Sequence, residues 1–199
     1  ECHLRLGNLD QARLVYEDIE NRLPSLGPKA AWDKAMMYYR ASLFGEARNL
    51  LKDFLKRYPS DPKAAETYYW LGWAYYRDNQ TAEAVNAFTA LRDQFPKTRF
   101  GQEANFRIAD SYFNGKQWQA AVTAYRQALD SPQWAEDAYY GLVLALLKLN
   151  QVAEAETSLN QYANRFPSGV LIDELKDKLA QKNQNQTGAT NTATPGLQP

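Results

Sequence analysis

A short motif recurs at a nearly constant interval along the chain. Four segments end in a large apolar residue followed by a proline, at Pro24, Pro59, Pro96 and Pro167. These prolines lie 35, 37 and 71 residues apart, and the last interval is two repeats with Pro132 in its middle. A fixed period of about 20 to 50 residues is the signature of repeat architectures, in which each unit packs only against its neighbours. The period therefore predicts a stacked array of similar units.

A small residue followed by a large one marks the same place in every repeat. Twelve residues before each of the four prolines is an alanine, which follows a short polar turn such as Gly7-Asn8. The alanines, including one in the repeat between, are Ala12, Ala47, Ala84, Ala121 and Ala155, and the large residues four positions later are Tyr16, Leu51, Phe88, Tyr125 and Leu159. Residues four apart share one helical face. The pattern predicts a helix whose packing face combines a small alanine, which leaves room for a neighbouring side chain, with a large residue one turn later.

A second amphipathic pattern precedes each alanine. Its clearest copy, residues 68–75, contains Leu71, Gly72 and Tyr75, and Ala35 and Ala109 stand where Gly72 would recur. A small residue there lets a paired helix approach closely. Each proline ends the second helix, because it cannot continue the hydrogen-bond ladder. Every repeat is therefore predicted to be a helix–turn–helix unit.

These positions resemble the tetratricopeptide repeat over roughly residues 1–167. In the best copy the matching residues are Tyr68, Leu71, Gly72, Tyr75, Ala84, Phe88, Leu91 and Pro96. The resemblance implies an all-α fold, a right-handed α–α superhelix of about four and a half repeats. The expected divisions are the C-terminal part of a truncated repeat at 1–26, repeats at 27–63, 64–100, 101–134 and 135–167, a capping helix at 168–181 and a disordered tail at 182–199. Because a solenoid unit cannot bury its apolar face alone, we expect the native protein to continue upstream of Glu1; a genuine half-repeat is the alternative.

The linkers give a narrower resemblance. The segment from Phe54 through Pro59-Ser-Asp-Pro62 to Leu71-Gly72 is similar to bacterial envelope tetratricopeptide proteins, of the Tol–Pal-associated coordinator and outer-membrane assembly lipoprotein types. This resemblance implies a non-catalytic scaffold or adaptor in a periplasmic or cell-envelope assembly. The alternative is an oligomerisation or regulatory module of a larger cytoplasmic signalling or secretion protein, and a homo-oligomer is also left open.

Composition and residue types argue against other classes of function. The 23 basic and 23 acidic residues cancel, whereas nucleic-acid binders usually carry a basic surplus. No apolar run approaches the roughly 20 residues that span a bilayer. Cys2 and His3 are the only cysteine and histidine, too few for a closed zinc site, and no phosphate-binding glycine loop or convergent catalytic group occurs. We therefore expect no enzyme activity, cofactor or metal, and a protein or peptide as the ligand.

The resemblance also implies where a partner binds, because the first helices of tetratricopeptide repeats line a concave groove. The groove residues mapped in this way are Trp32, Met36, Tyr39, Arg40, Tyr69, Trp73, Tyr76, Arg77, Phe106, Asp110, Phe113 and Tyr140. Aromatic side chains flanked by arginines suit a peptide with apolar anchors and some acidic character. The alternative is that these rings pack against neighbouring helices, since interface and core aromatics share the same chemistry.

Overall fold

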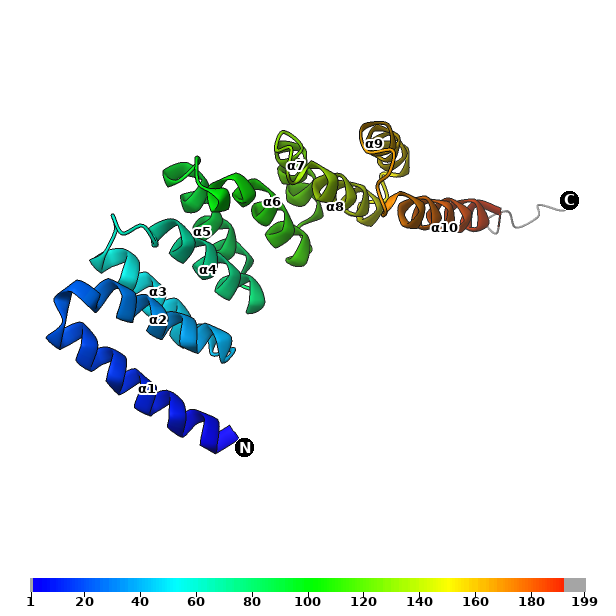
Figure 1. Ribbon diagram of the computed structural model, residues 1–199. Coiled ribbons are helices and arrows are strands. Elements are labelled where there is room, and N and C mark those ends of the chain that lie inside the picture. The colour runs from blue at the N-terminus through cyan, green and yellow to red at the C-terminus, as the bar shows by residue number, and fades with distance from the viewer. Residues whose placement is uncertain (1, 192–199) are drawn as a thin grey trace, which may run out of the picture. The chain divides into compact units, whose positions relative to one another are not determined.

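The computed structural model describes residues 2–191, and the side chains within this range from 8 to 184 (Figure 1). The described residues form ten α-helices and one 3₁₀-helix, and they contain no strand. The helices are α1 Cys2–Arg22, α2 Gly27–Arg40, α3 Phe44–Arg57, α4 Ala64–Arg77, α5 Thr81–Gln94, α6 Arg99–Asn114, α7 Trp118–Ala128, α8 Ala135–Lys148, α9 Val152–Arg165 and α10 Ile172–Asn191, with the 3₁₀-helix η1 at Pro24–Leu26. The predicted all-α helix-pair architecture is confirmed.

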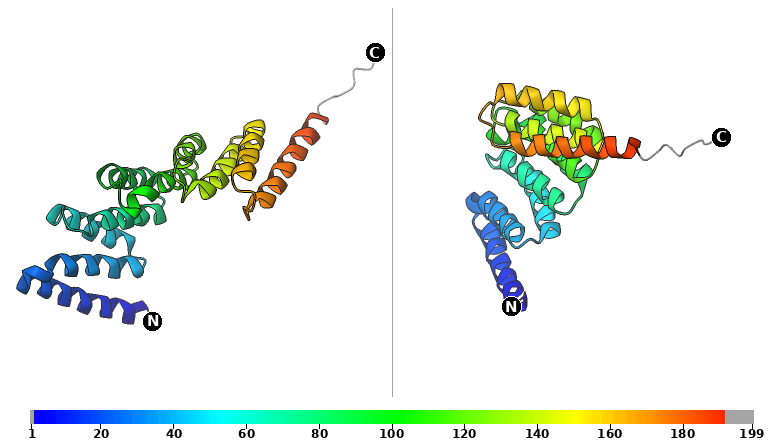
Figure 2. Two further views of the ribbon diagram at one scale, coloured as in Figure 1. Left: turned by 45° about the horizontal axis from the view of Figure 1, so that its top comes forward. Right: turned by 90° about the vertical axis from the view of Figure 1, so that its right-hand side faces the viewer.

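The chain divides into two compact units, at Gly115 and Lys116. In the first unit every helix from α1 to α6 packs on the next one along the chain, and α4 also packs on α6. Helices α1 and α2 lie side by side in both views of Figure 2. In the second unit α7 packs on α8, α8 on α9, and α10 on both α8 and α9. The division falls between the two helices of the predicted repeat 101–134.

Four turns inside the helix pairs share one backbone conformation. Ser42, Asn79, Lys116 and Asn150 have positive φ angles of 56° to 62°, and each lies five residues before the alanine of the second helix. The amide after each of Ser42, Asn79 and Asn150 donates a 3.0 Å bond back to the carbonyl five residues earlier. A residue in the left-handed conformation at this position reverses the chain within a few residues. It also lets the following amide donate a hydrogen bond to a carbonyl at the end of the first helix, which would otherwise have no partner.

The turn expected at Gly7-Asn8 does not form, and this prediction is wrong. Gly7 occupies the same position, five residues before Ala12, yet α1 runs as one helix from Cys2 to Arg22. Continuing the helix instead adds a backbone hydrogen bond for each residue fixed, which favours the straight form.

The C-terminal helix also differs from the expectation. The capping helix predicted at 168–181 begins at Ile172 and continues to Asn191, so residues 182–191 of the predicted tail are helical. The lysine, glutamines and asparagines that follow Gln181 carry no proline, and extending a helix that tertiary contacts have already formed costs little. Residues 192–199 of that tail lie outside the described residues.

The small–large pattern builds the core of each helix pair. The large residues Leu51, Phe88, Tyr125 and Leu159 are all buried. A Cβ atom added to Gly72 on α4 would lie 2.6 Å from Cε1 and Cζ of Phe88 on α5, within one helix pair, and Gly141 on α8 is equally crowded by Tyr125 on α7, the second helix of the preceding repeat. The ring therefore occupies the space that a side chain on the first helix would need, so the glycine sets how closely the two helices pack.

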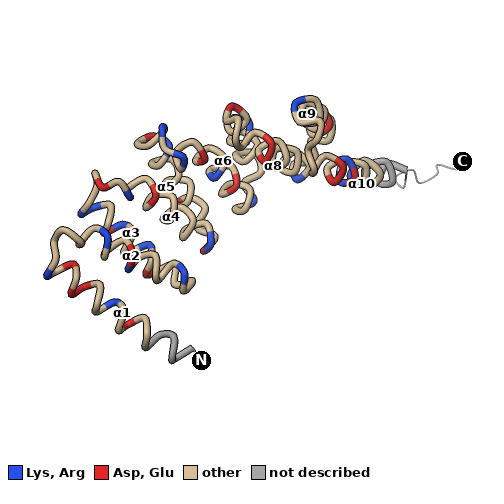
Figure 3. Tube along the Cα trace, viewed as in Figure 1, with Lys and Arg blue, Asp and Glu red and all other residues tan. Residues whose placement is uncertain are grey.

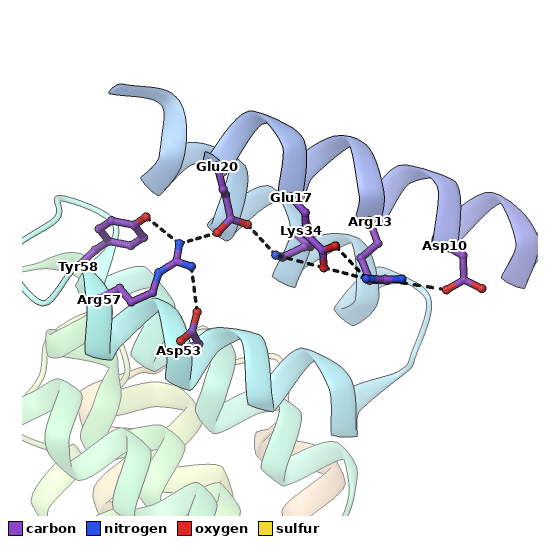
Figure 4. A network of polar contacts seen from close by, with 8 residues as sticks. All are labelled: Asp10, Arg13, Glu17, Glu20, Lys34, Asp53, Arg57 and Tyr58. Atoms are coloured by element: carbon purple, nitrogen blue, oxygen red, sulfur yellow. Dashed lines mark hydrogen bonds and ion pairs between the residues drawn. The ribbon is translucent and has the colours of Figure 1, made fainter. Parts of the chain in front are cut away.

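A network of ion pairs fixes α1 to the next two helices (Figure 4). One carboxylate oxygen of Glu20 on α1 lies 2.6 Å from Nζ of Lys34 on α2, and the other lies 2.5 Å from Nη2 of Arg57 on α3. The side chains of Glu20 and Lys34 are each only 9% exposed. Glu17 extends the network, because it pairs with Arg13 at 2.8 Å and lies 4.0 Å from Lys34. Removing one member would leave an opposite charge buried without its counterion, which is strongly destabilising.

This network predicts an acid-sensitive contribution to stability. Burial alone would raise the pKa of Glu20, but hydrogen bonds and charges from Lys34 and Arg57 outweigh it and place the pKa below the ordinary value. A lowered folded-state pKa stabilises the fold fully above the unfolded-state pKa, and the effect is lost as the pH falls through the folded-state value. We expect the Glu20→Gln variant to lose stability at neutral pH and to show a flatter decline below about pH 4.5. Urea unfolding midpoints across this pH range measure both effects. Glu156→Gln, which changes an exposed carboxylate on α9, should retain the wild-type profile; a matching profile for Glu20→Gln would contradict the prediction.

Candidate interaction surface

The structure separates the predicted groove residues into three groups. Trp32, Met36 and Phe106 are at most 9% exposed, so these three contribute packing and not accessible contact area. Arg40 and Arg77 are exposed. The remaining seven are partly exposed: Tyr39, Tyr69, Trp73, Tyr76, Asp110, Phe113 and Tyr140. For Trp32 and Phe106 the structure thus agrees with the alternative expectation, that rings on this helix face pack in the interior.

Ring contacts in the first unit show how this packing works. The ring of Tyr39 on α2 lies 5.0 Å from that of Trp70 on α4, in an edge-on arrangement that aromatic pairs favour. Tyr69 on α4 contacts Phe100 on α6 at 4.8 Å, and Trp73 contacts Tyr76, also on α4, at 5.1 Å. The aromatic residues thus join α2 to α4 and α4 to α6. Trp70 was not among the predicted groove residues, because its position is Asp33 in one repeat and Arg107 in another and so carries no repeating signal.

A buried polar cluster lies beneath the rings between α4 and α6. The hydroxyl of Tyr69 donates to Oε1 of Glu103 at 2.9 Å, and Nε of Arg107 donates to the same oxygen at 2.5 Å. Burial and the nearby Glu103 charge both raise the pKa of Tyr69, so its hydroxyl stays protonated. The guanidinium of Arg107 also lies 4.9 Å from the ring centre of Trp73 and 3.1 Å from Asp110. These bonds hold Trp73 and Asp110 in place next to the accessible part of the helix face.

The most accessible part of the predicted site is at the last turns of α2 and α4. Tyr39-Arg40 ends α2 and Tyr76-Arg77 ends α4, at positions 37 residues apart. Phe44, at the start of α3, joins them, because its ring lies 5.4 Å from the ring of Tyr39 and 5.8 Å from the guanidinium of Arg77. We call these five residues the Arg–Tyr surface. Phe44 was also missed by the sequence analysis, since it begins a second helix and the prediction was confined to first helices.

The charges on the Arg–Tyr surface are not neutralised within the described residues. No carboxylate there pairs with Arg40 or Arg77, and the neighbouring Asp78 pairs with Arg48 on α3. Basic residues mark the C-terminal ends of α2 and α4 in Figure 3. Burial raises the pKa of Tyr39 and of Tyr76, so both hydroxyls remain neutral donors beside the two cations. The surface combines half-buried rings, two hydroxyls and two guanidinium groups.

The second unit presents a different face. Tyr140 on α8 donates to Oε1 of Glu174 on α10 at 3.0 Å, and burial raises its pKa. The structure thus uses the hydroxyl of this predicted groove residue to hold the capping helix. Leu144 and Leu147, one and two turns further along α8, are partly exposed and buried. This unit therefore lacks the paired Tyr-Arg positions of the first.

The described residues contain no group of three or more side chains suited to hold a metal ion. The side chains of Cys2 and His3 lie outside the described residues. None of the helices over residues 2–191 combines the length and apolar character that crossing a membrane would require.

Comparison with known proteins identifies the class of fold as a helix-pair repeat. Two solved structures of MamA match. The one from AMB-1 has a TM-score of 0.60 and 16% identity, over 85% of this chain and 88% of that one. A fragment from Desulfovibrio magneticus RS-1 has a TM-score of 0.59 and 18% identity, over 82% of this chain and 93% of that one. The apo form of RapI matches with a TM-score of 0.73 and 13% identity over 90% of this chain, which spans 55% of the RapI chain. At these identities the likeness shows the fold alone. No curated protein sequence matches the chain.

The family is shown by a model that covers more than half of the sequence. The tetratricopeptide repeat model matches residues 32–99 and 106–170, and the chain belongs to this family. Such repeats are protein-interaction modules, whose stacked units present extended binding surfaces. The family assignment thus supports a protein partner.

The polar cluster under the rings makes a testable contribution to stability. Replacing Tyr69 by phenylalanine removes a hydrogen bond to a carboxylate that is 2% exposed, which should cost about 1.5 kcal/mol of unfolding free energy. The neighbouring Tyr68→Phe change removes a hydroxyl that accepts an exposed 3.3 Å bond from Gln94, and it should stay within about 0.5 kcal/mol of wild type. Urea unfolding of the two variants measures the difference. Equal stability of the two would show that Glu103 does not depend on Tyr69.

Proposed function

We propose that this chain is a non-catalytic scaffold that holds a segment of a protein partner on the Arg–Tyr surface. The observation that carries the proposal is the pair of exposed guanidinium groups, Arg40 and Arg77, which have no carboxylate partner among the described residues. Guanidinium groups bind carboxylates through strong charge-assisted hydrogen bonds. Half-buried tyrosines beside them offer contact area that loses little conformational entropy on binding. The favoured ligand therefore carries acidic groups next to an aromatic or aliphatic anchor.

The repeat geometry suggests how the acidic groups of such a ligand are spaced. Arg40 and Arg77 occupy equivalent positions on two first helices that touch through Tyr39 and Trp70. A ligand that reaches both arginines therefore carries two carboxylates separated along its length, one for each guanidinium group.

Charge reversal on the Arg–Tyr surface tests the proposal directly. Peptides selected from a random library against the immobilised chain should be enriched in Asp or Glu beside an apolar residue. The Arg40→Glu, Arg77→Glu double variant should bind a selected acidic peptide at least about tenfold more weakly, because two attractive charge pairs become repulsive. Fluorescence anisotropy at low and high salt measures the affinity, which should fall as salt rises.

The matched control is Arg99→Glu, since Arg99 is an exposed arginine of the same unit at the start of α6. This variant should bind the peptide as wild type does. Unchanged affinity in the double variant, or selection of peptides without acidic residues, would remove the Arg–Tyr surface as the binding site.

We further propose a bacterial cell-envelope assembly as the setting, on the resemblance of the Phe54-to-Gly72 segment to envelope tetratricopeptide proteins. The alternative is an oligomerisation or regulatory module of a larger cytoplasmic signalling or secretion protein. Fractionation of cells that express the native gene separates the two. The envelope setting predicts the protein among periplasmic or membrane fractions, and recovery with the cytoplasmic proteins would refute it.

A further inference from the structure

Neighbouring second helices carry a basic and an acidic residue at matching positions in both units. In the second unit Arg126 on α7 forms an ion pair with Glu154 on α9. Arg126 lies five residues after the alanine of its repeat, and Glu154 lies one residue before the alanine of the following second helix. Lys52 on α3 and Glu83 on α5 occupy these same positions in the first unit. Yet Lys52 and Glu83 form no ion pair with each other or with any other residue that the structure describes.

Lys52 contacts an aromatic ring in place of this carboxylate. Its Nζ lies 5.3 Å from the ring centre of Tyr75 on α4, and the guanidinium of Arg48 lies 5.1 Å from the same centre. Arg48 is neutralised by Asp78, so the charge that stays uncompensated at this ring is that of Lys52. An exposed cation–π contact is weak and does not neutralise the cation, so the ammonium can still pair with a carboxylate of a ligand.

A hollow of about 270 Å³ lies between α3 and α5, and both Lys52 and Glu83 line it. The apolar part of its lining comes from Tyr68, Leu71 and Tyr75 on α4 and from Ala87 and Ala90 on α5. Leu71, Tyr75 and Ala87 are at most 7% exposed, so the hollow borders the core of the α4–α5 pair. A small apolar hollow with charges beside it suits one large apolar side chain of a ligand.

Ala90 is the residue that makes room for this hollow. Each of the other second helices carries a larger polar residue at this position, and all four are exposed: Asp18, Asp53, Gln127 and Gln161. A long side chain there would extend over the space that Ala90 leaves empty. The hollow is therefore a feature of this one repeat and not of the repeat pattern.

The equivalent place between α1 and α3 shows the opposite arrangement. Lys34 on α2 stands where Leu71 stands on α4, and Glu17 on α1 stands where Lys52 stands on α3. Nζ of Lys34 lies 4.0 Å from Glu17 and 2.6 Å from Glu20, so the charges there neutralise one another. The chain thus fills this place with its own charges between α1 and α3 and bridges it between α7 and α9, whereas between α3 and α5 the two charges remain available to a ligand.

We propose that the hollow between α3 and α5 binds a segment of a partner protein through one inserted leucine, isoleucine or phenylalanine side chain. An acidic residue of that segment pairs with Lys52, and a basic residue pairs with Glu83. Charge complementarity selects this occupant, because a segment with charges of one sign would place a like charge beside Lys52 or beside Glu83. The site shares no residue with the Arg–Tyr surface, and its ligand carries charges of both signs.

Peptide selection against the Arg40→Glu, Arg77→Glu double variant tests this site while the Arg–Tyr surface is disabled. Peptides selected from a random library should combine a large apolar residue with an acidic and a basic residue within about four positions of it, since residues up to four apart share one helical face. A selected peptide, titrated into the isotope-labelled double variant, should shift the NMR signals of Leu71, Ala87 and Ala90.

Two further substitutions in the double variant locate the contact. Ala90→Gln should weaken binding of the selected peptide at least about tenfold, because the longer side chain fills the hollow. Lys52→Glu should weaken it about fivefold or more, since an attractive charge pair becomes repulsive. In the wild-type chain, Ala90→Gln should retain the acidic peptide that binds the Arg–Tyr surface, so failure of one site is distinguishable from failure of the other.

The matched control is Ala82→Gln, the same substitution at an exposed alanine of α5 that does not line the hollow. Glutamine already occurs at both positions in other repeats, as Gln127 in place of Ala90 and Gln119 in place of Ala82, so both variants should fold. Circular dichroism checks this, and Ala82→Gln should bind the selected peptide as the double variant does.

Three results would overturn the proposal. One is a selection that yields no peptide with this charge pattern, or a peptide that causes no shifts at Leu71, Ala87 and Ala90 at about 1 mM, a weak limit for any specific contact. Another is equal binding by the Ala90→Gln and Ala82→Gln variants. The third is concentration-dependent self-association in sedimentation equilibrium that Ala90→Gln abolishes, because a second copy of the chain would then be the occupant.

Discussion

The close approach of a small residue to a large one is the constraint on which the rest of this structure depends. Gly72 leaves room for Phe88 and for no side chain of its own, so the distance between the helices of a pair is set at this contact. Because each helix pairs mainly with its neighbours along the chain, the same contact also determines which faces stay accessible. Two surface features of the first unit are what this packing leaves uncovered: the Arg–Tyr surface and the partly exposed Ala12, Tyr16 and Ile19 on α1.

Sequence reasoning identified the features that repeat and missed those that do not. The period of the alanines and large residues gave the helix pairs, because burial imposes the same residue types in every copy. Trp70 has no counterpart, since its position is Asp33 and Arg107 in other repeats, and Phe44 begins a second helix, outside the first helices to which the prediction was confined. Both rings nevertheless contact that of Tyr39. Trp32 and Phe106 were expected to be accessible and are buried. The same helix face can contact a ligand or a neighbouring helix, and the residue type alone does not distinguish these two environments.

Charge pairing distinguishes the structural side chains from the candidate binding ones. The chain carries equal numbers of acidic and basic residues, and a few of them pair across helices, as Glu20 pairs with Lys34 and Arg57. Such buried pairs hold helices at a fixed angle, but they offer nothing to a partner because their charge is already compensated. Arg40 and Arg77 differ in being exposed, next to rings, and without a carboxylate in reach among the described residues. Neutral overall composition therefore does not imply a neutral surface at the ends of α2 and α4.

The same repeat logic explains why the two surfaces differ in chemistry. At the last turns of α2 and α4 the pairs are complete, so the accessible groups are polar tips and ring edges that suit a short segment with charges. Among the described residues α1 has no first helix ahead of it, so Ala12, Tyr16 and Ile19 are partly exposed at positions that other repeats bury. Residues of this type pack against another helix whose surface alternates small and large side chains, and they offer no partner to isolated charges. The four equivalents of Tyr16 in the other repeats are large side chains buried against another helix, and this is the kind of contact that its position favours.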